Sequence, residues 1–125
     1  MPAGRILVVD DEMNVRRVVA DMLRLAGYEV TEADSGEEAL AAAQTTPPDL
    51  LLSDLRLQGI QGFELLQALR ESRPGLRAIA MTGFADETCR RAALDAGYHH
   101  VICKPFSIRD LMAAVDRLFP GRPSG

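Results

Sequence analysis

The sequence predicts an α/β fold in which helices cover both faces of one parallel sheet. Five short apolar runs alternate along the chain with five longer segments whose apolar residues recur at helical spacing. Such a series forms a parallel sheet, because right-handed crossovers return each strand to the same sheet. With 125 residues and no internal repeat, the chain has the length of one ordinary domain.

Each predicted strand is a short apolar run that meets polar or turn residues at its end. The run at residues 6–9 contains β-branched residues and no polar one, so it is predicted to be buried on both faces. The five strands are predicted over residues 6–9, 28–33, 50–54, 78–81 and 99–103.

The helices are predicted from apolar spacing together with residues that start or stop a helix. Ser35 and Ser107 have capping-box spacing, and Asp86 can cap the fourth helix. Gly27 is placed to end the first helix, and Pro120 ends the last. The helices are predicted over residues 14–26, 36–44, 62–72, 87–96 and 108–119.

Several residues at helical or strand spacing are predicted to face the core. Val18 is assigned to the buried side of the first helix and Ile108 to that of the last, while Cys103 is assigned to the core of the fifth strand. The fourth helix offers only small side chains for burial, namely those of Cys89, Ala92, Ala93 and Ala96. We therefore expect this helix to be weakly held.

Composition excludes several classes of protein. The formal net charge of −4 argues against direct nucleic-acid binding by this domain. Two cysteines without a C-x-x-C pair suggest neither a disulfide framework nor a zinc site. No apolar run approaches a membrane span, and no signal peptide is recognisable, so we expect a cytoplasmic protein without a membrane partner.

Charged and polar residues follow four of the predicted strands at the edge where a parallel sheet binds its ligands. They are Asp10, Asp11 and Glu12 after the first strand, Asp54 after the third, Thr82 after the fourth and Lys104 after the fifth. Crowded carboxylates need a neutralising cation, and their hard oxygen atoms suit Mg²⁺, with Mn²⁺ as a substitute. A hydroxyl and an ammonium beside them can stabilise a phosphoryl group.

Lys104 is the only lysine among 14 basic residues. The sequence therefore uses a compact point charge at this edge and the planar guanidinium elsewhere. Together, these residue types predict a site for metal-assisted phosphoryl transfer to a carboxylate.

Four segments, at residues 7–12, 54–62, 81–83 and 104–106, resemble those of the receiver domains of bacterial two-component response regulators. The resemblance covers residues 4–119. It implies a flavodoxin-like three-layer (βα)5 sandwich with strand order 2-1-3-4-5. It also implies a receiver domain over residues 1–119, with residues 120–125 as a tail or the start of a linker.

The resemblance assigns a role to each residue at the predicted edge. Asp54 would accept a phosphoryl group from a histidine kinase or a histidine phosphotransfer protein. Thr82 would be the switch hydroxyl and Lys104 the phosphate-contacting lysine, followed by a cis bond to Pro105. The Mg²⁺ ligands would be Asp10, Asp11, Asp54 and the backbone carbonyl of Arg56.

The sequence departs from the family pattern at positions that shape the response. Val101 replaces a common aromatic residue, which puts a rotamer change at that position in doubt. Arg56 and Phe84 stand where relatives modulate hydrolysis of the acyl phosphate. Gln58 and Gln61 replace the usual proline and Asp or Asn in the loop after Asp54, and should alter the shape of that loop modestly.

The sequence-based hypothesis is a signalling phosphoacceptor, with at most slow self-dephosphorylation, and not an enzyme. Phosphorylation would shift the fourth helix and change the surface formed by helix four, strand five and helix five, through which the domain could also form a homodimer. The alternative is a non-phosphorylated pseudo-receiver that acts as an interaction module. A haloacid-dehalogenase-type phosphatase would need an Asp at the position of Arg56, and a flavin mononucleotide carrier would need a Ser/Thr/Gly-rich phosphate loop after the first strand.

Overall fold

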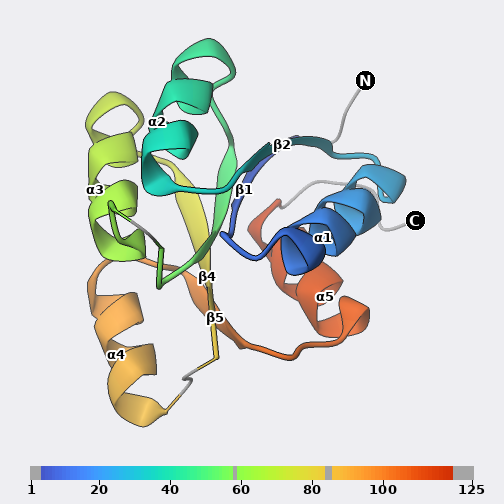
Figure 1. The fold of residues 1–125 in the computed structure, drawn as a ribbon. Helices are drawn as coiled ribbons and strands as arrows, with labels where there is room; N and C mark the ends of the chain where they lie inside the picture. The colour runs from blue at the N-terminus through green and yellow to red at the C-terminus, as the bar shows by residue number, and fades with distance from the viewer. Residues whose placement is uncertain (1–3, 58, 84–85, 120–125) are drawn as a thin grey trace.

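The five strands form one parallel sheet in the order β2-β1-β3-β4-β5 (Figure 1). A computed structural model of the chain describes residues 4–57, 59–83 and 86–119. The strands are β1 Arg5–Val9, β2 Glu29–Ala33, β3 Leu50–Asp54, β4 Arg77–Thr82 and β5 His100–Cys103. The predicted number, direction and order of the strands are confirmed.

Within the described residues, five helices cover the sheet in two layers. Figure 1 shows α1 and α5 together on one side of the strands and α2, α3 and α4 on the other. Their bounds are α1 Met13–Leu25, α2 Gly36–Thr45, α3 Gly62–Ser72, α4 Glu87–Asp95 and α5 Ile108–Leu118. This is the three-layer arrangement that the sequence predicts.

The two faces of the sheet bury separate apolar clusters because successive strand residues point to opposite sides. From β1, Leu7 and Val9 pack with the α2, α3 and α4 side, whereas Ile6 and Val8 pack with the α1 and α5 side. All four side chains are at most 1% exposed. A strand buried on both faces is therefore confirmed at the centre of the sheet.

Three predicted helix caps are present. The Ser35 hydroxyl accepts a hydrogen bond from the Glu38 N–H at 3.1 Å, and that of Ser107 accepts one from the Asp110 N–H at 3.0 Å. The Asp86 carboxylate accepts one from the Cys89 N–H at 2.7 Å. These bonds satisfy N–H groups that have no partner inside the helix.

Five residues predicted to face the core are exposed. Val18 and Ile108 are 51% and 36% exposed, because each lies at the margin of its helix's apolar stripe. Ala92 and Ala96 are exposed, since α4 covers little of the sheet. Cys103 is exposed at the end of β5, an edge strand. None of the helices in the described ranges combines the length and the hydropathy that a membrane span needs.

Candidate functional site

Three carboxylates meet at the carboxyl end of the sheet, as predicted. Asp10 follows β1 directly and Asp54 is the last residue of β3, which pairs with β1. Carboxylate oxygens of Asp10, Asp11 and Asp54 all lie within 4.8 Å of one another. Asp10 is fully buried, the Asp54 side chain is 13% exposed, and Asp11 is exposed to solvent. The cluster is therefore open on the side of Asp11.

The ammonium of Lys104, which directly follows the edge strand β5, bridges two of these acids. Its Nζ donates to Oδ2 of Asp10 at 2.7 Å and to Oδ2 of Asp54 at 2.8 Å. Burial lowers the pKa of Lys104, but the hydrogen bonds and charges of Asp10 and Asp54 outweigh it, and the net shift is upward. The lysine therefore stays cationic, and it neutralises a carboxylate that has no access to solvent.

The second oxygen of each bridged carboxylate is held by the backbone. Oδ1 of Asp10 accepts a hydrogen bond from the Glu12 N–H at 2.9 Å, and Oδ1 of Asp54 accepts one from the Arg56 N–H at 3.0 Å. Both side chains are thus fixed in orientation. Because three formal negative charges face one ammonium, the cluster keeps two formal negative charges.

Thr82 lies beside the acidic cluster at the end of β4. It is 2% exposed, and its carbonyl accepts a hydrogen bond from the Lys104 N–H at 2.7 Å. The preceding residue, Met81, is the register partner of Asp54. The Lys104–Pro105 peptide bond is cis, as the resemblance to receiver domains implies.

The loop after Asp54 is organised by Gln61, which sequence reasoning treated only as a departure from a pattern. Its side chain accepts a hydrogen bond from the Leu57 N–H and donates to the carbonyls of Leu57 and Gly59. It also forms a capping box with Glu64 at the start of α3. The separation of three residues between Gln61 and Glu64 was the available signal.

The three predicted modulating positions differ in what the structure describes. Arg56 is exposed beside Asp54, and its N–H is bound to that carboxylate. Val101 is half-buried against the apolar cluster on the α3 side of the sheet. Phe84, like Gln58 and residues 120–125, lies outside the described residues.

The donor set at the strand ends fits a magnesium ion. Mg²⁺ takes hard oxygen ligands and is held by one or two carboxylates together with water. Asp10, Asp11 and Asp54 supply carboxylate oxygens close together, and two uncompensated negative charges match a divalent cation. The exposure of Asp11 leaves room for water on the open side.

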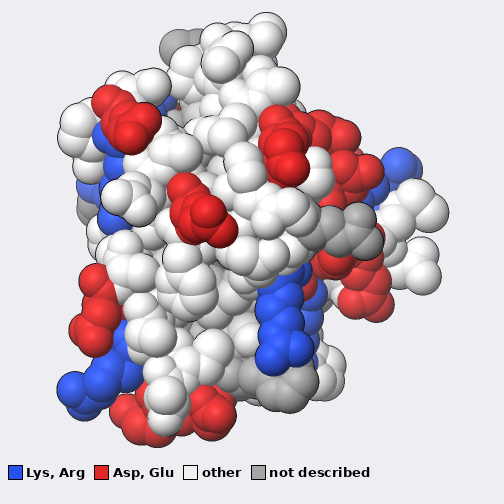
Figure 2. All heavy atoms as spheres, turned by 60° about the vertical axis from the view of Figure 1, so that its left-hand side comes forward, with Lys and Arg blue, Asp and Glu red and all other residues white. Residues whose placement is uncertain are grey.

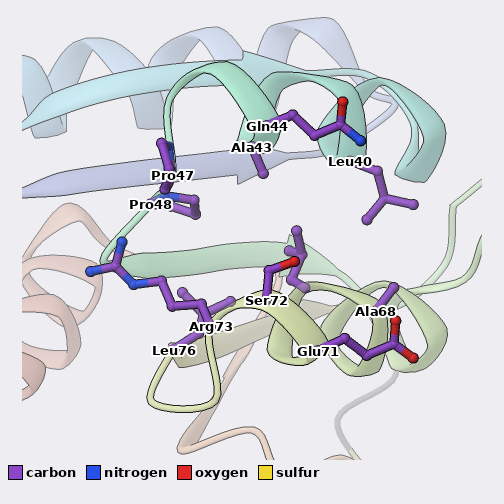
Figure 3. Close-up of a pocket in the computed structure, with 11 residues that line it drawn as sticks. Leu40, Ala43, Gln44, Pro47, Pro48, Ala68, Glu71, Ser72, Arg73 and Leu76 are labelled. Carbon is purple, nitrogen blue, oxygen red and sulfur yellow. The ribbon is translucent and has the colours of Figure 1, made fainter.

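Another hollow lies away from this site. A cleft of about 740 Å³ separates α2 from α3, with Leu40 on one wall and Ala68 on the other (Figure 3). Pro48 precedes β3 and Leu76 precedes β4, so the cleft is near the amino ends of those strands, away from Asp54. The face seen in Figure 2 is largely uncharged, and its acidic side chains form several separate groups, the largest of them at the upper right.

A smaller hollow of about 480 Å³ adjoins the site between α1 and the loop that joins β5 to α5. Lys104 forms part of its wall, together with apolar residues such as Val15, Val19 and Phe106. The exposed side chain of Val18 also borders it. This hollow therefore gives the site an apolar neighbour on the α1 side.

Residues 6–116 match the family model of the response regulator receiver domain. The chain belongs to this family. It is 38% identical over 117 residues to the DNA-binding transcriptional regulator NtrC of Klebsiella pneumoniae, an alignment that covers 94% of this chain and 25% of that protein. The chain thus spans about a quarter of the length of this curated relative.

Solved receiver structures superpose closely on this one. The chemotaxis response regulator CheY4 of Vibrio cholerae matches with a TM-score of 0.85 and 30% identity, covering 92% of this chain and 98% of that one. The receiver domain of NtrX from Brucella abortus matches with a TM-score of 0.86 and 32% identity, covering 93% and 98% respectively. The predicted flavodoxin-like fold is confirmed.

Membership places the chain among the receiver domains of the response regulators of two-component systems. A receiver domain is a signalling module and not a classical enzyme. Receiver domains bind Mg²⁺ at an acidic pocket, and a cluster of Asp10, Asp11 and Asp54 is present in this chain.

Proposed function

We propose that Asp54 is the phosphoacceptor of this domain and that the transfer depends on Mg²⁺. The observation that carries the proposal is the double hydrogen bond of the Lys104 ammonium to Asp10 and Asp54 at the strand ends. It presents a carboxylate beside a fixed positive charge, where a phosphoryl group could be both attached and stabilised. Family membership supports the same role.

Asp10, Asp11, Asp54 and the backbone carbonyl of Arg56 would hold the metal. When bound, Mg²⁺ neutralises phosphoryl oxygens and orients them for in-line displacement. The chain's own residues supply the rest. Lys104 is close enough to Asp54 to contact a phosphoryl group there, and the backbone N–H groups of Glu12 and Arg56 hold the two carboxylates in orientation.

The transfer step forms one bond and breaks another. A carboxylate oxygen of Asp54 bonds to phosphorus, and the phosphorus–nitrogen bond of a phosphohistidine donor breaks. The imidazole leaves with the electron pair of that bond and takes up a proton. Asp54 gives up no proton, because its carboxylate is the nucleophile. Hydrolysis of the acyl phosphate by water would return Asp54 slowly, at a rate modulated by Arg56 and Phe84, whereas Val101 would modulate the conformational response.

Thr82 would follow the new phosphoryl group and displace the segment that leads into α4. The described residues of α4 bury one side chain, that of Ala93, so its displacement costs little apolar burial. The surface formed by α4, β5 and α5 would then report the phosphorylation state as a population shift. The same surface is the proposed contact of a homodimer.

Intact-mass measurement tests the acceptor. With Mg²⁺ and acetyl phosphate, the wild type should gain the mass of one phosphoryl group, and chelation of the metal should abolish the gain. Asp54→Asn should gain nothing, because an amide is not a carboxylate nucleophile, while Asp95→Asn, at the exposed end of α4, should behave as the wild type. A wild type that gains no mass would refute the proposal and favour a pseudo-receiver that acts as an interaction module.

The apolar hollow beside Lys104 is the proposed docking place for a histidine kinase or a histidine phosphotransfer protein. Val18 of α1 and Ile108 of α5 line this hollow and are 51% and 36% exposed. Burial of these side chains by a helical partner would bring its phosphohistidine next to Asp54.

A charge placed in this hollow separates docking from chemistry. Val18→Glu should slow transfer from a phosphorylated histidine donor at least tenfold, because a buried carboxylate opposes docking. Transfer from acetyl phosphate should be unchanged. Leu25→Glu is the matched control, since Leu25 is 82% exposed on the same helix and does not border the hollow. Equal effects of the two substitutions would contradict this docking place.

The extent of the domain and its location complete the proposal. We propose that the receiver domain occupies residues 1–119, that residues 120–125 form a tail or the start of a linker, and that the domain works in the cytoplasm, where histidine kinases transfer phosphoryl groups.

A further inference from the structure

The chain has two tyrosines, and both are buried with their hydroxyl groups bonded. The Tyr28 hydroxyl donates to the Asp116 carboxylate at 2.9 Å, and its ring packs on Phe119 of the α1 and α5 side. The Tyr98 hydroxyl donates to the carbonyl oxygen of Gly62 at 2.6 Å. A buried phenol requires a hydrogen-bond partner, but only Tyr98 takes its partner from the first residue of α3, where the loop that follows Asp54 ends.

Gly62 packs directly on the backbone of the acceptor residue. A Cβ atom at this position would lie 2.7 Å from the Asp54 carbonyl oxygen and 2.9 Å from the Leu55 Cα. The Gly62 N–H also donates to the Leu55 carbonyl at 3.2 Å. Displacement of the Gly62 carbonyl therefore moves atoms that touch Asp54.

Ser53 also contacts the backbone of Asp54. Its hydroxyl is fully buried and donates to the Asp54 carbonyl at 2.9 Å. Burial raises the pKa of Tyr98, and the neighbouring Ser53 hydroxyl lowers it only in part. The phenol is thus a neutral donor at physiological pH, and Tyr98, Ser53 and Gly62 surround the backbone of Asp54.

The backbone of Tyr98 lies in the segment that joins α4 to β5. Its N–H donates to the carbonyl of Ala93, the buried residue of α4, at 3.0 Å. The preceding Gly97 has φ +111° and accepts a hydrogen bond from Arg70 of α3 at 2.8 Å. If α4 moves and Tyr98 moves with it, the Tyr98 hydroxyl must therefore shift relative to the Gly62 carbonyl.

We propose that Tyr98 is a positioning residue for Asp54, which fixes the acceptor loop through Gly62 and Ser53 and couples that loop to the α4–β5 junction. The proposal rests on the proposed role of Asp54 as phosphoacceptor. Tyr98 is not catalytic, because its hydroxyl contacts backbone and Ser53 and not the reacting carboxylate. Movement of α4 after phosphorylation would alter the Tyr98 hydrogen bond, and weakening of that bond would loosen the acceptor.

Removal of one hydroxyl tests the positioning role. Tyr98→Phe keeps the ring and loses the bond to Gly62, so phosphorylation by acetyl phosphate should slow roughly two- to tenfold, the range that one neutral hydrogen bond supports. Tyr28→Phe removes a comparable buried hydroxyl from the other side of the sheet and should stay within about twofold of the wild type, well below the upper end of that range. Equal rates in the two variants would overturn the proposal.

Tyrosine fluorescence gives a second readout that does not depend on the fold of Tyr98→Phe. The chain has no tryptophan, so Tyr28→Phe leaves Tyr98 as the sole strong intrinsic fluorophore. Emission from this variant should change when acetyl phosphate is added with Mg²⁺, and the change should be absent from Tyr28→Phe/Asp54→Asn. A phosphorylated Tyr28→Phe protein with unaltered emission would overturn the coupling.

The two proposals fail in different ways. A wild type that gains no phosphoryl mass refutes the acceptor role, and the positioning role with it. A wild type that is phosphorylated, alongside a Tyr98→Phe variant with normal kinetics or a Tyr98 emission that does not respond, refutes the positioning role alone.

Discussion

The helices α3 and α4 lie next to each other on one face of the sheet but are held very differently. α3 buries Leu65, Leu66 and Leu69, whereas the described residues of α4 bury Ala93 alone. Each leucine contributes about 1.5–3 kcal/mol on burial, and an alanine methyl contributes about 0.8 kcal/mol. The helix after Asp54 is therefore part of a rigid platform, and the helix after Thr82 is the cheaper one to move.

The largest loss of stability is expected when the buried carboxylate of Asp10 loses its ion-pair partner, Lys104. Lys104→Met keeps most of the side-chain volume but leaves the fully buried Asp10 without its ammonium. We expect a loss of about 3–5 kcal/mol in the free energy of unfolding, measured with urea in metal-free buffer. Asp10→Asn in the same background should recover part of the loss, because it removes the unpaired charge. An unchanged urea midpoint in Lys104→Met would show that the Lys104 ammonium does not stabilise the buried Asp10 carboxylate.

Truncation of one leucine in each helix measures the contrast directly. Leu66→Ala empties a fully buried position of α3 and should cost about 2–5 kcal/mol of unfolding free energy. Leu94→Ala removes the same atoms from a side chain of α4 that is 41% exposed, and should cost at most about 0.5 kcal/mol. Similar losses in the two variants would show that α4 is held more firmly than its burial indicates.

A small pH effect reports on the position of α4. Burial lowers the pKa of His100 on β5, and Arg117 of α5 and Arg90 of α4 lower it further. Because the folded pKa lies below the ordinary value of 6.5, this histidine contributes stability that is complete above pH 6.5 and is lost as the pH falls through the folded pKa. The pKa of His99 is also lowered, first by burial, but its charged neighbours are Arg70 and Arg77.

Histidine ring resonances should therefore respond selectively to arginine substitutions. Arg117→Gln should raise the titration midpoint of His100 more than Arg90→Gln does, by a few tenths of a pH unit, since Arg117 lowers the pKa of His100 more than Arg90 does. His99 should keep its midpoint in both variants and serves as the internal control. A larger shift of the His100 midpoint in Arg90→Gln than in Arg117→Gln would show that α4 lies closer to β5 than its slight burial indicates.

Sequence reasoning succeeded where the information is local. The strand runs and helix caps depend on residues a few positions apart, so Ser35, Asp86 and Ser107 were identified correctly. It failed at Val18 and Ile108, because apolar periodicity does not tell how wide a stripe the neighbouring elements cover. Gln61 was undervalued for a related reason, since its bonds depend on the path of a loop.

By itself, the sequence determined which chemical groups stand at the carboxyl ends of the strands. Asp10, Asp54, Thr82 and Lys104 each follow an apolar run, and parallel strands must bring their ends to one edge. Only the tertiary structure decided that Lys104 bonds both acids, that α4 is scarcely buried and that Tyr98 touches the acceptor loop. These are contacts between residues 36 to 94 positions apart, and no local propensity encodes them; they arise from the packing of whole layers.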